Sequence, residues 1–126
     1  MGLISAGAHR ALDFVVVLAF AVAPTLFGMT GRSAMLAYAL AVVHLLVTLL
    51  THVPGRERRP IPYPAHGVLE LLVGVAMVCV PIVRHWTAGA RTFYIGFGVV
   101  LLLVWLLTSY RERATAAAGG AGTPLA

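Results

Sequence analysis

Charge is scarce in this chain of 126 residues, and several polar residue types are missing. Lysine, asparagine and glutamine do not occur, only 10% of the residues are charged, and 60% are hydrophobic. The mean hydropathy is +0.95. A soluble domain of this length could not bury so much apolar surface, so we expect lipid to solvate part of the chain.

Cysteine is almost absent as well. The single residue, Cys79, lies inside an apolar run. One cysteine excludes an internal disulfide and the paired-thiol chemistry of membrane disulfide enzymes. We therefore expect Cys79 to be buried and inert. The sequence also contains no phosphate-binding loop and no evident nucleophile–base set, so nothing in it indicates an enzyme.

Arginine supplies all nine basic residues, and the formal net charge is +5. These arginines stand between apolar runs, without a continuous basic stripe or interleaved aromatic residues, which argues against nucleic acid as a partner. Contact with lipid headgroups is the more fitting use of such charges. The arginines also predict an orientation. Arg10, Arg56, Arg58, Arg59, Arg111 and Arg113 fall on one side, against Arg32, Arg84 and Arg91 on the other.

This bias predicts a multi-pass protein of a prokaryotic cell (inner) membrane with both termini in the cytoplasm. Four apolar runs are long enough for a bilayer crossing, which takes about 20 residues of helix. They cover residues 9–28, 34–51, 65–83 and 92–109. The short links within each pair of runs predict antiparallel neighbours. The expected fold is an all-α bundle of four transmembrane helices.

The chain also repeats itself at an offset of 57 residues. Ile4–Asp13 recurs as Ile61–Glu70, and the register continues without a gap to Thr51 on Thr108, with 16 of 48 positions identical. We therefore predict two tandem two-helix repeats related by a pseudo-two-fold axis along the membrane normal. The predicted divisions are a first repeat at 1–53, a cytoplasmic linker rich in proline and arginine at 54–64, a second repeat at 65–110 and a disordered tail at 111–126.

Each half of the chain has His-x-x-x-acid, an apolar helix with a proline, a short turn and an apolar helix ending in threonine. This order of features resembles the SPW-repeat integral membrane proteins of bacteria. The Ser-Pro-Trp triplet of that family reads Ala23-Pro24-Thr25 and Val80-Pro81-Ile82 here, so only the proline is kept. The resemblance implies a small four-helix membrane protein, alone or fused to other modules, and it implies no reaction.

The repeated histidine and acid are the sharpest candidate site. His9 and Asp13, like His66 and Glu70, are four residues apart and therefore share one face of a helix. A carboxylate inside the membrane boundary needs a partner. We expect each pair to anchor the start of its helix and to hydrogen-bond the linker or the other pair. Alternatively, the four residues form a metal site with histidine and carboxylate ligands.

A second polar face follows the run at 34–51. It comprises Tyr38, Ala41, His44, Thr48, Thr51 and His52, whereas the residue 57 positions after His44 is Leu101. His44 is expected to point into the bundle or a subunit interface, satisfied by a carbonyl or a carboxylate. Alternatively, it ligates haem or relays a proton.

Three functions remain open on the sequence alone. The first is a non-catalytic membrane module, either a homo-oligomer or an accessory part of a larger membrane complex. The second is a small proton- or ion-coupled transporter in which Asp13 and Glu70 titrate. The third is a haem- or metal-binding membrane protein that uses His9, His44 and His66.

Overall fold

The computed structural model describes residues 2–110, and the predicted tail at 111–126, with Arg111 and Arg113, lies outside the described residues. The described part is helical, with α1 (Ala6–Leu26), α2 (Gly31–Leu50), α3 (Tyr63–Val83) and α4 (Ala88–Leu107). All four helices are long and apolar enough to cross a membrane. Their length and composition indicate a multi-pass membrane protein, as predicted.

The helix ends differ from the predicted ones by up to four residues, because the apolar runs omit first turns that consist of small or polar residues. The helix α1 begins at Ala6 instead of residue 9, since the Ser5 hydroxyl accepts a hydrogen bond from the backbone N–H of Ala8 at 3.1 Å. The same helix ends before Gly28, whose φ of 60° suits the turn that follows.

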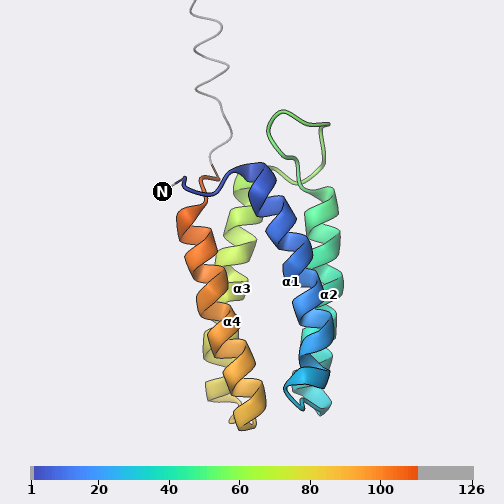
Figure 1. The fold of residues 1–126 in the computed structure, drawn as a ribbon, viewed down its shortest axis with the longest axis vertical. Coiled ribbons are helices and arrows are strands. Elements are labelled where there is room, and N and C mark those ends of the chain that lie inside the picture. Colours follow the sequence, from blue (N-terminus) through green and yellow to red (C-terminus); the bar gives the residue numbers. More distant parts are fainter. Residues whose placement is uncertain (1, 111–126) are drawn as a thin grey trace, which may run out of the picture.

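The helices form two antiparallel hairpins, α1 with α2 and α3 with α4 (Figure 1). Each bound of α3 and α4 lies 57 residues after the matching bound of α1 and α2. We call the end of the bundle with the 51–62 linker the linker end, and the end with the two short interhelical turns the turn end. At the linker end, Ile4 N–H donates to Leu107 O at 3.1 Å and Ile61 N–H donates to Leu50 O at 3.0 Å.

Close packing within the second hairpin depends on two glycines. A Cβ at Gly98 would lie 2.9 Å from the Met77 Cβ and 3.1 Å from the Gly74 carbonyl oxygen. A Cβ at Gly74 would lie 2.8 Å from Leu102. Small residues at a helix interface allow this approach of two backbones.

Aromatic residues join the two hairpins farther toward the turn end. The ring of Phe20 on α1 lies 6.0 Å from that of Phe93 and 5.5 Å from that of Phe97, both on α4. The Tyr94 hydroxyl donates to the Ser33 carbonyl on α2 at 2.6 Å. These contacts place the apolar core between the hairpins.

Two side chains lie elsewhere than predicted. Cys79 is exposed on the surface of α3, so the expectation of a buried thiol is wrong. Tyr38 is 49% exposed and does not extend the inward polar face of α2. In a membrane protein an apolar run does not distinguish a lipid-facing position from a core position, because both are apolar.

Candidate functional site

Five ionisable side chains meet between the hairpins near the linker end. His9 and Asp13 come from α1, His44 from α2, and His66 and Glu70 from α3. His9, Asp13, His66 and Glu70 are all buried. The cost of an unpaired carboxylate in the membrane predicts this burial. The structure thus brings both predicted His-acid pairs into one cluster.

Asp13 is the centre of the cluster. Its Oδ1 lies 3.3 Å from Nε2 of both His9 and His44, and its Oδ2 lies 3.4 Å from Nε2 of His66. His9 Nε2 is also 3.2 Å from Oε2 of Glu70. The contacts therefore run both within α1 and across the two hairpins.

Two threonines at helix ends orient the histidines. The Thr51 hydroxyl donates to Val47 O at 2.5 Å, and the Thr108 hydroxyl donates to Val104 O at 2.7 Å. A hydroxyl has one proton to give. The bonds from Thr51 to Nδ1 of His66, at 2.9 Å, and from Thr108 to Nδ1 of His9, at 3.0 Å, therefore have the imidazole as donor.

This assignment places a proton on Nδ1 of both histidines and directs Nε2 toward the acids. With the proton on Nδ1, a neutral imidazole presents the lone pair of Nε2. Both Nε2 atoms point at carboxylate oxygens. That of His9 also lies 3.3 Å from the Tyr110 hydroxyl, and that of His66 is buried and makes no hydrogen bond within residues 2–110. Nitrogen and oxygen lone pairs repel one another, so the arrangement requires positive charge among them, from protons or from a metal ion.

Four of the five side chains have the geometry of a metal site. One ligand atom from each of His9, Asp13, His66 and Glu70 lies within 4.8 Å of the others. Imidazole nitrogen and carboxylate oxygen are ligands of Zn²⁺ and Fe²⁺. These are the four residues that the sequence offered as metal candidates. His44 lies outside this set.

Two tyrosines that the sequence motifs did not indicate, Tyr63 and Tyr110, cover the cluster. The Tyr110 hydroxyl donates to Oε2 of Glu70, and the Tyr110 ring lies 5.3 Å from that of His9. Tyr63 is 2% exposed and its ring lies 5.0 Å from that of Tyr110. Burial, and then the charge of Glu70, raise the pKa of Tyr110 well above its usual range. Neither tyrosine has a counterpart 57 residues earlier, so the repeat could not reveal them.

The other polar residues predicted on the inward face of α2 differ in whether they contact the cluster. Thr51 belongs to the cluster through His66. Thr48 is buried, but its hydroxyl makes no hydrogen bond within the described residues, and its carbonyl accepts one from Arg10 at 2.8 Å. His52 contacts the linker instead, with Nδ1 3.1 Å from Glu57 O.

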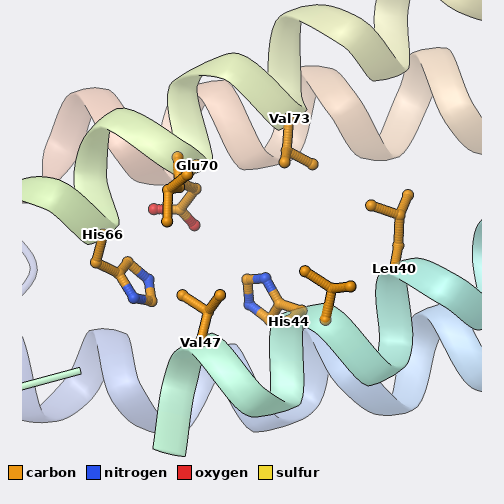
Figure 2. Close-up of a pocket in the computed structure, with 8 residues that line it drawn as sticks. Leu40, His44, Val47, His66, Glu70 and Val73 are labelled. Atoms are coloured by element: carbon orange, nitrogen blue, oxygen red, sulfur yellow. The ribbon is translucent and has the colours of Figure 1, made fainter. Parts of the chain in front are cut away.

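A pocket of about 70 Å³ lies between α2 and α3 beside the cluster. Figure 2 shows the side chains of His44, His66 and Glu70 directed into the space between these helices. The rest of its lining is aliphatic: Leu40, Val43, Val47, Leu69 and Val73.

The comparisons with known proteins add no relative: no protein-family model, no curated protein and no solved structure matches the chain.

Proposed function

We propose that this chain is a membrane protein that binds one divalent transition-metal ion, Zn²⁺ or Fe²⁺, through His9, Asp13, His66 and Glu70. The observation that carries the proposal is the convergence of their ligand atoms within 4.8 Å, with Nε2 of both histidines directed at the carboxylates. A metal ion satisfies two carboxylates and two imidazoles at once.

The hydrogen bonds behind the ligands support a metal. A metal-ligating histidine almost always donates its second N–H to an oxygen that sets its tautomer and ring orientation. Thr51 and Thr108 supply such oxygens to His66 and His9. Anchoring of the helix starts requires no particular tautomer, so a purely structural cluster leaves this matched pair of bonds unexplained.

The other functions open on the sequence receive less support. Haem needs a slot beside its axial histidine, whereas the pocket at His44 measures about 70 Å³. A carrier is expected to hold its ion near the bilayer midplane, whereas Asp13 and Glu70 lie in the early turns of α1 and α3. The non-catalytic accessory or homo-oligomeric module is compatible with a bound metal, and we propose that setting for it.

We also propose the architectural relationships expected from the sequence. Two observations support a duplication with a pseudo-two-fold axis. The helix bounds of the two halves match at an offset of 57 residues, and the backbone bond of Ile4 to Leu107 matches that of Ile61 to Leu50. The arginine bias supports cytoplasmic termini in a prokaryotic inner membrane. The repeated motifs support kinship with the SPW-repeat proteins.

Elemental analysis of the purified protein tests the metal proposal. The protein is purified in detergent, any histidine tag is removed, and the metal is counted per chain. We expect one equivalent of Zn²⁺ or Fe²⁺. After chelation and addition of Co²⁺, we expect visible absorption bands of cobalt bound to nitrogen and oxygen ligands.

A matched pair of variants locates the ion. The His9→Ala/His66→Ala protein should retain no metal, whereas His52→Ala/His85→Ala removes as many histidines outside the cluster and should retain it. A parent protein that binds neither native metal nor Co²⁺ overturns the proposal, and so does equal metal binding by both variants.

A further inference from the structure

The two hairpins meet along two interfaces, one between α1 and α4 and one between α2 and α3, which we call seams. Side chains of different size fill the two seams. Where α1 meets α4, three aromatic rings occupy the interior, those of Phe20, Phe93 and Phe97. The Phe93 and Phe97 rings stack with centroids 5.2 Å apart. Phe20 and Phe93 are 0% and 4% exposed, so this seam is closed by large side chains.

The seam between α2 and α3 has smaller residues at the matching positions. At an offset of 57 residues, Phe20 corresponds to Met77, Phe93 to Leu36 and Phe97 to Leu40. A pocket of about 150 Å³ lies there, and its lining includes all three of these smaller residues. The apolar pocket thus lies in the seam where smaller side chains stand in place of the three phenylalanine rings.

This opening continues toward the linker end. Leu40 and Val73 line both the 150 Å³ pocket and the 70 Å³ pocket that ends at His44, His66 and Glu70 (Figure 2). We call the two together the α2–α3 groove. Its walls are aliphatic, and its polar end is the buried cluster. A groove of this kind suits a molecule with an apolar tail and a small polar head.

His44 is the distinctive residue at the polar end. The residue 57 positions later, Leu101, is 1% exposed and belongs to the hydrophobic core. Asp13 accepts a hydrogen bond from Nε2 of His44 at 3.3 Å. An ionised carboxylate only accepts, so the proton of this imidazole is on Nε2, and Nδ1 is an acceptor. Within residues 2–110, Nδ1 of His44 has no hydrogen-bond partner.

We propose that the α2–α3 groove binds an uncharged single-chain lipid with a hydroxyl head, and that this hydroxyl donates a hydrogen bond to Nδ1 of His44. Two features define the head. The free nitrogen of His44 needs a hydrogen-bond donor, and entry through the hydrocarbon of the bilayer disfavours any charge.

The lipid site stands apart from the metal site. The head contacts His44, which is not one of the four proposed metal ligands, and the tail contacts aliphatic residues of α2 and α3. The groove is therefore expected to bind the lipid in both the metal-loaded and the chelated protein.

Photolabelling in lipid nanodiscs tests the proposal. The probe is a long-chain 4-alkylphenol with a diazirine in its tail, and mass spectrometry locates the label. Two control probes share the tail, the methyl ether of the phenol and the matching fatty acid. We expect the phenol to label residues of the α2–α3 groove about tenfold more than either control, as the loss of one hydrogen bond implies.

Variants distinguish the groove from the rest of the lipid-facing surface. Leu36→Phe/Leu40→Phe copies the rings of the other seam and should abolish groove labelling. Leu46→Phe/Leu50→Phe has the same spacing at lipid-facing positions of α2 and should leave labelling unchanged. His44→Leu should reduce phenol labelling to the level of the ether. Thermal unfolding of each variant establishes that it is folded.

Equal labelling by the phenol and its ether overturns the proposal, because the groove then accepts any tail. Equal labelling by the fatty acid, or no effect of the ring-filled variant Leu36→Phe/Leu40→Phe, also overturns it. Metal binding without selective labelling contradicts the lipid site alone. Selective labelling in a protein that binds no metal contradicts the metal site alone.

Discussion

Thr51 and His66 form a hydrogen bond of 2.9 Å that joins the end of α2 to the second hairpin. The matching bond, from Thr108 at the end of α4 to His9 on α1, measures 3.0 Å. Each hairpin thus orients the histidine of the other. The two bonds couple assembly of the hairpins to the geometry of the buried cluster. Substitution of one threonine should therefore alter both the assembly and the cluster geometry.

The first prediction concerns these threonines. In Thr51→Val, His66 loses the oxygen that holds its Nδ1 proton, and its ring orientation is no longer set. We expect the metal affinity to fall on the order of 10–100-fold, measured by competition with a chromophoric chelator. Thr108→Val should behave alike through His9.

Thr92→Val is the control for this series. The Thr92 hydroxyl makes the same kind of bond within its helix, to Ala88 O at 2.8 Å, but contacts no histidine. Its metal affinity should equal that of the parent. A parallel loss in all three variants would mean that the hydroxyl bonds act on helix stability and not on the histidines.

The second prediction separates a metal role from a structural role at Glu70. An amide can still accept the hydrogen bond of Tyr110, so Glu70→Gln should keep the fold. It should lose the metal, because a neutral amide is a poor ligand for Zn²⁺ or Fe²⁺. Glu70→Leu leaves the Tyr110 hydroxyl without an acceptor and should be less stable by about 1–3 kcal/mol.

We would measure thermal unfolding in detergent and metal content for both Glu70 variants. Together the two measurements distinguish a metal-binding role of Glu70 from a structural one. Retention of full metal content by Glu70→Gln would remove Glu70 from the ligand set. If both variants match the parent in stability and in metal, neither account of this residue holds.

The third prediction concerns the packing of α3 against α4. Gly98→Ala places a methyl group 2.9 Å from the Met77 Cβ and 3.1 Å from a backbone oxygen, so the helices must separate. We expect a loss of about 1–3 kcal/mol in the free energy of unfolding. Gly96→Ala, whose Cβ meets nothing within 4 Å, should be neutral. Equal stability of the two variants would contradict the close approach.

The fourth prediction tests the tyrosine cover. A Cβ at Gly67 would lie 2.5 Å from Cγ of Tyr110, so Gly67→Ala should displace that ring from Glu70. We expect a chelator to remove the metal on the order of tenfold faster. Gly7→Ala, with open space around its Cβ, should exchange at the parental rate. An unchanged rate in Gly67→Ala would mean that Tyr110 does not shield the cluster.

Much of the fold could be predicted from the sequence because hydropathy alone determines which runs of this chain cross a membrane. The four runs correspond to the four helices, with errors confined to the helix ends, where for example Ser5 caps α1 and Gly28 follows it. The burial of His9, Asp13, His66 and Glu70 was equally predictable, since a membrane charge needs a partner.

The partners themselves were not predictable. The sequence places His9 one turn from Asp13, but only the packing of the helices brings Glu70 to His9, and His44 and His66 to Asp13. Tyr110 lies 40 residues from Glu70 along the chain, and no local pattern links them. The exposure of Cys79 was missed for a related reason, since lipid and core select the same apolar residues.

The sequence by itself determined the helices, their pairing through short turns and the four buried ionisable residues, because these depend on composition and on contacts within a few turns. The tertiary structure alone decided which ring nitrogen of His9 and of His66 faces the acids and which interface between the hairpins stays open. Those features depend on where Thr51 and Thr108 meet the opposite hairpin, and on which seam holds the three phenylalanine rings. Such contacts join residues far apart in the chain, and only the packing of one hairpin on the other sets their distances.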